Sequence, residues 1–187
     1  PYPDEILNRL IARFTGDELS VSRAAALYTL TDEPPLHNLL YALKYKGRSR
    51  IGVEFGRELG EVLRLLDFTG YNAILPVPIH RAKQLERGYN QAEEIARGIG
   101  DVLQTQVEQE WLVRNRYTQS QTTMNAIARR TNVSTAFAGG KQYSSIRGTV
   151  ILLVDDVLTT GSTLNACATA LLELGARQVD AATLVVA

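Results

Sequence analysis

The second half of the chain alternates short, largely apolar segments with segments of helical spacing, and this alternation constrains the fold more than any other feature. The largely apolar segments are residues 73–79, 149–154 and 179–186, whereas residues 89–103 and 162–174 are expected helices. A strand that is apolar on both faces is typical of a parallel sheet covered by helices on both sides. We therefore predict an α/β protein built on a parallel sheet.

The rest of the chain adds elements to this plan. Residues 24–30 and 107–113 are expected strands, and residues 115–134 are polar, basic and poorly periodic. A stretch of that kind inside a compact domain is typical of a functional loop or a disordered segment. Helical spacing predicts three further helices, over residues 4–14, 36–47 and 51–66.

The most informative motif is ILLVDDVLTTGST at residues 151–163. Four apolar residues lead directly into two carboxylates, Asp155 and Asp156. We expect the strand to end there, at the sheet edge where ligands of open α/β proteins bind. The small residues that follow let backbone N–H groups close around an anion at the start of the next helix. We interpret the turn as a phosphate cradle, which consists of Thr159, Thr160, Gly161, Ser162 and Thr163.

Two carboxylates beside a phosphate cradle would repel a plain phosphate ligand. They are accounted for if the ligand also carries hydroxyl groups that donate to them, as a ribose diol does. They also suit positive charge that develops on the sugar during reaction. The motif therefore predicts a ribose 5-phosphate binder. The alternative is an ordinary strand-to-helix turn with one aspartate as a cap, and neither a Walker A lysine nor a G-x-G-x-x-G fingerprint is present.

The composition excludes several classes of protein. Twenty Lys and Arg residues balance twenty Asp and Glu residues, so no overall field attracts nucleic acid or a membrane. The one cysteine, Cys167, fits a packed helix rather than a disulfide framework or a four-cysteine zinc site. No apolar run approaches the roughly 18 residues of a membrane span, and the first residues lack the features of a signal peptide. We expect a soluble, cytoplasmic protein with no membrane partner.

Longer stretches of the sequence resemble a known family. The motif at residues 151–163 resembles the signature of the type I phosphoribosyltransferases, which bind 5-phosphoribosyl 1-diphosphate (PRPP) with magnesium. Three further stretches resemble the ComF family (competence protein F, also described as amidophosphoribosyltransferase-like): LLYALKYKGRSRIG at 39–52, LPVPIHRAKQLERGYNQAEEIARGI at 75–99 and LVRNRYTQSQTTMNAIARRTNVSTAF at 112–137. The four-cysteine zinc module with which that family usually opens has no counterpart in this sequence, so metal-dependent or DNA-related roles of that module are not carried over.

The resemblance implies a type I phosphoribosyltransferase-like parallel sheet flanked by helices. Residues 67–187 would form the core, and residues 1–66 a small N-terminal hood of the same domain. Asp155 and Asp156 would be catalytic and hold the ribose 2′- and 3′-hydroxyls, and the cradle would hold the 5′-phosphate. Mg²⁺ would arrive with PRPP, either without direct protein ligands or on these two carboxylates.

The resemblance also implies residues for the diphosphate and for a closing loop. Asn90 and Gln91 complete an RG-x-NQ pattern and would flank the same pocket. The diphosphate would face His80, Arg81, Lys83, Arg87 and Gly88. A flexible loop that closes over the site would carry Arg114, Gln121 and Arg129. Plainer interpretations remain open, because His80 also fits a solvent-facing loop and Arg87 a surface ion pair.

The reaction implied by the resemblance is displacement of diphosphate from C1′ of PRPP by a nitrogen nucleophile, linked to DNA uptake. No motif indicates which nitrogen acceptor is used. The alternative is a non-catalytic module of natural transformation that senses PRPP, or that binds single-stranded DNA or other competence proteins. The balanced charge and the lack of aromatic residues interleaved with basic ones count against DNA. A homodimer is left open.

Overall fold

The computed structural model describes residues 3–12, 14, 19–30, 49–114 and 136–187, and the account of the fold concerns these residues. The helix predicted over residues 36–47 and the loop predicted over residues 115–134 lie outside them. Gln121 and Arg129 lie outside them as well.

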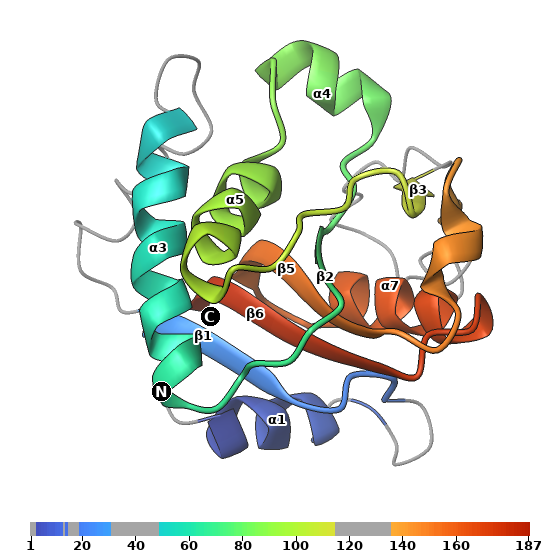
Figure 1. Ribbon diagram of the computed structural model, residues 1–187. Coiled ribbons are helices and arrows are strands. Elements are labelled where there is room, and N and C mark those ends of the chain that lie inside the picture. Colours follow the sequence, from blue (N-terminus) through green and yellow to red (C-terminus); the bar gives the residue numbers. More distant parts are fainter. Residues whose placement is uncertain (1–2, 13, 15–18, 31–48, 115–135) are drawn as a thin grey trace, which may run out of the picture.

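The centre of the fold is a parallel sheet of four strands in the order β1–β6–β5–β2 (Figure 1). These strands are β1 (Ala24–Thr29), β6 (Gln178–Val186), β5 (Val150–Leu158) and β2 (Ala73–Pro76). The two central strands, β5 and β6, are buried almost throughout, because helices cover both faces of the sheet. The α/β architecture predicted from the apolar strands is therefore confirmed.

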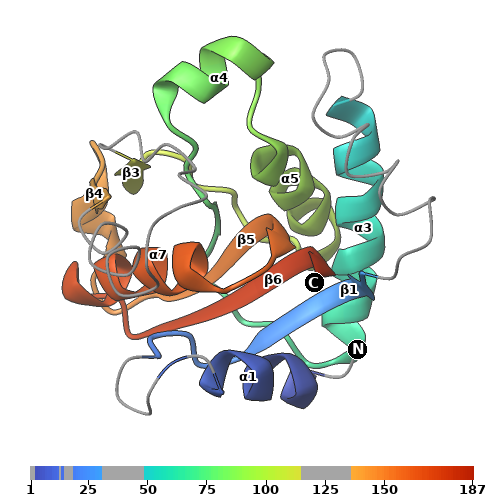
Figure 2. The same ribbon diagram turned by 180° about the vertical axis from the view of Figure 1, so that it is seen from behind.

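Among the described residues, helices cover both faces of the sheet (Figures 1 and 2). On one face, α3 (Ser49–Leu65) and α5 (Gln91–Leu103) enclose a core with the sheet that includes Leu59, Ile95 and Leu152. On the other face, α1 (Pro3–Ile11) and α7 (Ser162–Glu173) enclose a second core. Two separate hydrophobic cores therefore hold the sheet between them. No described helix is long and apolar enough to cross a membrane.

The strand β5 is longer than the sequence predicts. The expectation that it ends before the paired carboxylates is wrong, because β5 continues through Asp155 and Asp156 to Leu158. The reason is its neighbour β6, which is equally long and pairs with it in parallel from Val150 to Leu158. The carboxylates are therefore fixed by the sheet itself rather than by a loop.

The segment between α5 and β5 also differs from the prediction. The single strand expected over residues 107–113 is wrong: Val107 makes one isolated parallel bridge to Ile74, and β3 (Leu112–Arg114) forms separately. Between them the chain turns so that Trp111 is buried against the core, and the Trp111 carbonyl accepts the Gly140 N–H at 2.9 Å. The unpredicted β4 (Phe137–Gly139) then pairs antiparallel with β3, and a short 3₁₀ helix, η2 (Tyr143–Ile146), precedes β5.

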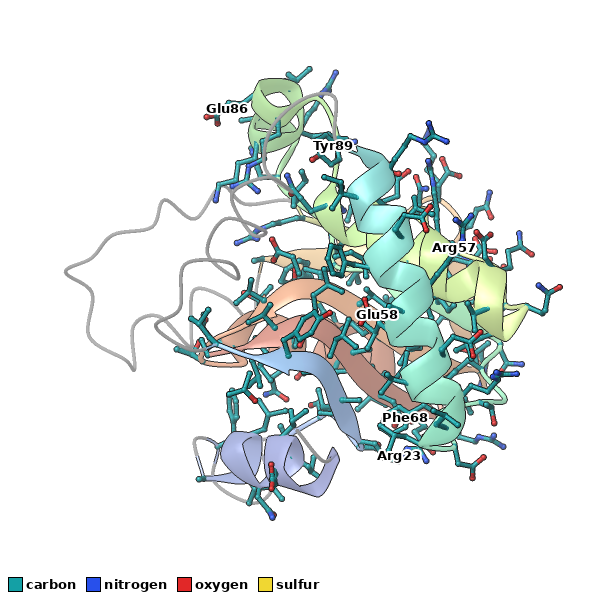
Figure 3. All side chains as sticks on the ribbon, turned by 90° about the vertical axis from the view of Figure 1, so that its left-hand side faces the viewer. Arg23, Arg57, Glu58, Phe68, Glu86 and Tyr89 are labelled. Carbon is teal, nitrogen blue, oxygen red and sulfur yellow. The ribbon has the colours of Figure 1, made fainter. Side chains whose placement is uncertain are left out.

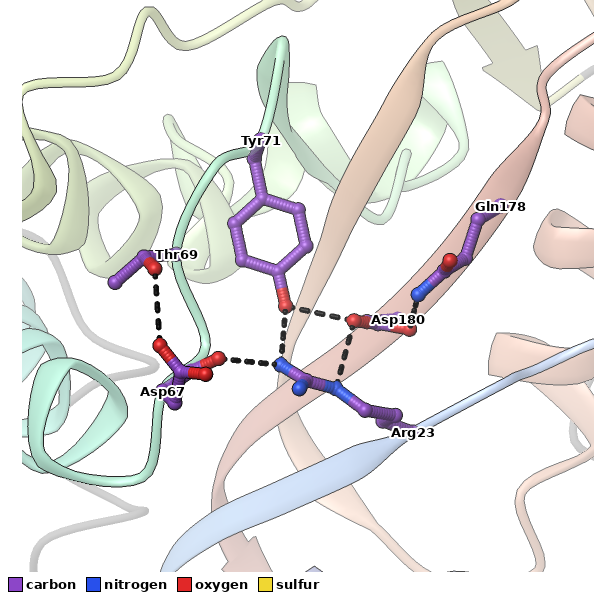
Figure 4. A network of polar contacts seen from close by, with 6 residues as sticks. All are labelled: Arg23, Asp67, Thr69, Tyr71, Gln178 and Asp180. Atoms are coloured by element: carbon purple, nitrogen blue, oxygen red, sulfur yellow. Dashed lines mark hydrogen bonds and ion pairs between the residues drawn. The ribbon is translucent and has the colours of Figure 1, made fainter.

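A polar network around the buried carboxylate of Asp180 ties the amino ends of the strands together (Figure 4). The Asp180 carboxylate at the start of β6 accepts the Tyr71 hydroxyl at 2.8 Å and Arg23 Nε at 3.1 Å. The Arg23 guanidinium also lies 3.8 Å from the ring centroid of Phe68. Arg23 and Phe68 lie at the opposite end of α3 from Tyr89 (Figure 3). The network therefore stabilises the end of the sheet that faces away from the paired aspartates.

Candidate functional site

Asp155 and Asp156 lie near the end of β5, at the carboxyl edge of the sheet. Asp155 pairs in register with Thr183 of β6, and both aspartates are half-buried. Asp155 Oδ1 accepts the backbone N–H of Asp156 at 2.9 Å. The strand therefore presents two acidic side chains at the edge where a parallel sheet binds ligands.

The surroundings of Asp155 disfavour its charged form. Burial raises the pKa of the carboxyl well above its ordinary range, and the charge of Asp156 raises it further. Arg114, the last residue of β3, opposes both effects and lowers this pKa, so its guanidinium lies within electrostatic range of Asp155. Approaching cations or hydrogen-bond donors would favour the charged carboxylate. The site is therefore suited to a ligand that brings such groups.

Cys167 on α7 lies close to the same carboxyl. The side chain is fully buried, as the sequence predicts for a residue of a packed helix. Burial raises the pKa of its thiol, and the charge of Asp155 raises it further. The thiol is therefore held in its neutral form, and it behaves as a small core side chain rather than as a nucleophile.

The hydroxyl-bearing turn connects β5 to the start of α7. The N-cap of this helix is Gly161, which has no side chain to cap it. Thr160 Oγ1 instead accepts the Ser162 N–H at 3.4 Å and lies 3.1 Å from Ser162 Oγ. Thr159 and Thr160 are exposed, whereas Thr163 is half-buried. The first N–H groups of α7 and these hydroxyls can therefore donate to an anion.

Gly161 fixes the path of this turn against helix α1. Its φ angle is 77°, a left-handed conformation that side chains disfavour. A Cβ atom added there would overlap Leu10 Cδ2, and Leu10 is almost wholly buried in the core. The turn therefore has a fixed position relative to the core, which a preorganised anion site requires.

The residues that follow β2 form α4 (Arg81–Arg87), a helix that the sequence does not predict. It stands beyond the carboxyl end of β2, away from the body of the sheet (Figure 1). His80 is its N-cap and accepts the Ala82 N–H on Nδ1 at 3.2 Å. Its basic side chains vary in exposure: Arg81 is exposed, and Lys83 and Arg87 are half-buried. Basic residues are thus placed at the same edge of the sheet as the paired aspartates.

The start of α5 is tied directly to the end of β2. Asn90 caps the helix by accepting the Ala92 N–H at 3.2 Å, and its Nδ2 donates to the Val77 carbonyl at 3.0 Å. The Val77 N–H in turn donates to the carbonyl of Val154, the residue before Asp155, at 2.8 Å. Two successive hydrogen bonds, through Val77, therefore connect the amino end of α5 to the strand that carries the aspartates.

The predicted phosphate cradle and the predicted diphosphate segment thus lie at one edge of the sheet. The predicted flexible loop is only partly within the described residues. The cradle from Thr159 to Thr163 follows β5, and the segment from His80 to Gly88 follows β2. Arg114 ends β3 beside Asp155, whereas the other two residues of the predicted loop lie outside the described residues. The tie through Asn90 was not predicted; the available signal was an asparagine directly before a helical segment, which is typical of an N-cap.

The acidic pair can accept a magnesium ion only with help from a ligand. Among the described residues, no group of three or more His, Cys, Asp or Glu side chains is placed to hold a metal. Mg²⁺ is commonly held by one or two carboxylates together with water and substrate phosphates. Asp155 and Asp156 would fit that arrangement as the two carboxylates if Mg²⁺ binds together with a phosphate ligand.

Comparison with known proteins gives consistent matches. The family model of the phosphoribosyl transferase domain matches residues 85–187. The "DNA utilization protein YhgH" of Escherichia coli O157:H7 is 35% identical over 82% of this chain and 69% of that protein. "Competence protein F" of Haemophilus influenzae is 35% identical over 58% of this chain and 47% of that protein.

Among solved structures, the chain is similar to one described as the "allosteric regulatory enzyme of purine biosynthesis". The TM-score is 0.48 and the identity 20%, over 71% of this chain and 26% of that one. A hypoxanthine phosphoribosyltransferase from Staphylococcus aureus gives a TM-score of 0.45 at 15% identity, over 83% of this chain and 73% of that one.

Proposed function

The chain belongs to the phosphoribosyl transferase domain family, and from this premise we propose that it binds PRPP at the carboxyl edge of its sheet. We propose further that it transfers the phosphoribosyl group to a nitrogen acceptor and releases diphosphate. One observation carries the proposal: two half-buried carboxylates near the end of β5 are followed by a hydroxyl-rich turn at the start of α7, whose N-cap is a glycine. The hydroxyls of a sugar phosphate can donate to the two carboxylates, and its phosphate can accept hydrogen bonds from the turn.

The 5′-phosphate is assigned to the turn between β5 and α7. Backbone N–H groups of the first turn of α7 and the hydroxyls of Thr160 and Ser162 would donate to its oxygens. The dipole of α7 would stabilise a negatively charged group at this end of the helix by about 0.3–1 kcal/mol. Gly161 supports this assignment, because its contact with α1 holds the turn in place before the ligand arrives.

The ribose is assigned to Asp155 and Asp156. Their carboxylates would accept the 2′- and 3′-hydroxyls, and this bonding favours the charged form of Asp155 that burial disfavours. In the reaction, the C1′–oxygen bond breaks and its electron pair leaves with the diphosphate, while the acceptor nitrogen forms a bond to C1′ and loses its proton to solvent. Positive charge develops on the ring as the bond to diphosphate breaks, and fixed negative charge beside the ring stabilises it.

The diphosphate is assigned to the basic side of the site, near α4. His80, Arg81, Lys83, Arg87 and Gly88 all follow β2 at that edge. Mg²⁺ would neutralise charge on the diphosphate, and Asp155 and Asp156 are the residues that would hold it together with the phosphates. Arg114 would add positive charge from the side of β3. No described residue is assigned as a general base.

The test of PRPP binding is thermal unfolding with and without PRPP and Mg²⁺. We expect PRPP to raise the unfolding temperature of the wild type, because a ligand stabilises the state that binds it. The double variant Asp155→Ala/Asp156→Ala should show little shift, and ribose 5-phosphate should give a smaller shift than PRPP. An equal shift in the wild type and the double variant would contradict the roles given to the aspartates. Release of diphosphate with a panel of nitrogen acceptors then tests turnover.

A second candidate is a module that binds nucleic acid during DNA uptake without catalysis. It is favoured by the names of the relatives, "DNA utilization protein" and "competence protein", and by the basic, exposed helix α4. Binding of a single-stranded oligonucleotide at several salt concentrations distinguishes it. A steep loss of affinity with salt would support this candidate, whereas diphosphate release with an acceptor would support the transferase.

A further inference from the structure

The side chain of Gln91 at the start of α5 is buried but only half satisfied. Gln91 is 2% exposed, and its Oε1 accepts Arg87 Nη1 at 3.0 Å. Its Nε2 has no hydrogen-bond partner among the described residues. A buried donor without an acceptor is costly, and such groups are rare in folded proteins. A core side chain of similar size would avoid that cost, so the amide calls for an explanation.

The orientation of the amide follows from its neighbour. Arg87 is a guanidinium, which donates hydrogen bonds and cannot accept them. The oxygen of the amide must therefore face Arg87, and the nitrogen must be the atom that lacks a partner. Rotating the amide by half a turn would place two donors against each other. The unsatisfied group is thus an N–H donor, and it suits an oxygen acceptor.

The position of Gln91 relates this donor to the site. Gln91 follows Asn90, whose side chain bonds to Val77 at the end of β2. Val77 bonds to Val154, which precedes Asp155. From this edge the Gln91 side chain reaches toward Arg87 at the end of α4. The residue that carries this donor therefore connects the helix that bears the basic residues to the strand end next to the aspartates.

We propose that Gln91 is a binding residue with two functions: its Oε1 orients the Arg87 guanidinium, and its Nε2 donates to an anionic oxygen of the bound sugar diphosphate. This inference rests on the proposed function of the site. The ligand satisfies the amide, so the cost of the unpaired donor is removed on binding and adds to the affinity. Because Nε2 is covered in the free protein, the side chains around it must move when the ligand enters.

Tyr89 is the competing explanation for the amide. Burial and the charge of Glu94 raise the pKa of its hydroxyl, whereas the charge of Arg87 and a side-chain hydrogen bond from the Gln91 amide lower it. The Tyr89 hydroxyl is therefore the acceptor within the protein that lies near Nε2. The two groups nevertheless do not meet the distance and angle of a hydrogen bond in the free protein. The removal of the Tyr89 hydroxyl tests the choice directly.

The experiment measures the affinity for PRPP with Mg²⁺ by isothermal titration calorimetry, together with the unfolding temperature without ligand. The variants are Gln91→Met, Gln91→Glu and Tyr89→Phe, and Gln106→Met is the control because Gln106 is exposed. Gln91→Glu keeps an acceptor for Arg87 but replaces the donor with an acceptor. Gln91→Met removes both functions and fills a similar volume.

We expect both Gln91 variants to bind PRPP about tenfold more weakly or worse, the loss typical of one hydrogen bond to a charged group. Gln91→Met should unfold at or above the temperature of the wild type, because it leaves no buried donor unpaired. The control and Tyr89→Phe should bind like the wild type. Wild-type affinity in Gln91→Glu would overturn the donor role, since the amide would then serve only Arg87.

Two other results would also overturn the proposal. A loss in Tyr89→Phe equal to that in Gln91→Met would show that the tyrosine is the missing acceptor. If Gln91→Met binds PRPP as tightly as the wild type does, neither function proposed for the Gln91 side chain is correct. The proposed function of the protein would not be affected by that result. If the wild type itself does not bind PRPP, the proposed function and this inference both fail.

Discussion

Replacement of Gly161 by alanine tests whether the phosphate turn is held in place by the core beneath it. Two costs are expected. A non-glycine residue at φ 77° costs about 1–2 kcal/mol, and the overlap of the new Cβ with buried Leu10 costs about 1–3 kcal/mol more. The free energy of unfolding should therefore fall by about 2–5 kcal/mol, which lowers the unfolding temperature by roughly 4–20 °C for a chain of this size.

Gly148 provides a matched control for this substitution. Its φ angle is also 77°, but an added Cβ would meet nothing within 4 Å. Gly148→Ala should therefore cost only the backbone term of about 1–2 kcal/mol. The difference between the two variants isolates the contact with Leu10. Urea unfolding at equilibrium measures both free energies.

A double-mutant cycle completes the test. In a Leu10→Ala background the overlap is absent, so Gly161→Ala should cost no more than Gly148→Ala does in the wild type. The coupling energy between Leu10 and Gly161 is expected to be about 1–3 kcal/mol. Equal losses in Gly161→Ala and Gly148→Ala, with no coupling to Leu10, would refute the claim that α1 fixes the turn.

Three further predictions concern the rest of the fold. In the free protein the raised pKa of Asp155 means that the folded state binds a proton more tightly than the unfolded state. The free energy of unfolding, measured with urea, should therefore fall as the pH rises from about 4 towards neutrality. In Asp155→Asn this pH dependence should be weaker, and the variant should be more stable than the wild type at neutral pH. Asp180→Ala leaves the buried Tyr71 hydroxyl without its acceptor and should cost about 2–4 kcal/mol, whereas Asp101→Ala, which breaks an exposed ion pair, should cost about 1 kcal/mol or less. Gly98→Ala should destabilise the protein in thermal unfolding although alanine favours helices by about 1 kcal/mol, because the new Cβ would overlap a backbone carbonyl of α3; a gain in stability would contradict the close approach of α3 and α5.

Much of the fold could be predicted from the sequence, because its central strands are apolar on both faces. That pattern has few solutions other than a covered parallel sheet. The end of β5 could not be predicted, because Asp155 and Asp156 are unfavourable in a strand by propensity. Pairing with β6 overrides that preference, and no local pattern in the sequence reveals the length of a distant partner.

The parts of the candidate site that lie within one sequence motif could be predicted. The parts that are brought together from two distant segments of the chain could not. The aspartates and the hydroxyl turn are adjacent in sequence, so their proximity follows from a single strand-to-helix connection. The closeness of Arg114 to Asp155 depends on β3 pairing with a strand more than twenty residues further on. The unsatisfied amide of Gln91 depends on where α4 places Arg87, and α4 itself carries no buried residue from which to predict it.

The most direct test of the central claim is a crystal structure of the protein with PRPP and Mg²⁺. We expect the 5′-phosphate within hydrogen-bonding distance of the N–H groups of the first turn of α7. The ribose hydroxyls should lie on the carboxylates of Asp155 and Asp156, with the diphosphate toward α4. PRPP bound at another surface, or in this site with its ribose turned away from both aspartates, would contradict the account.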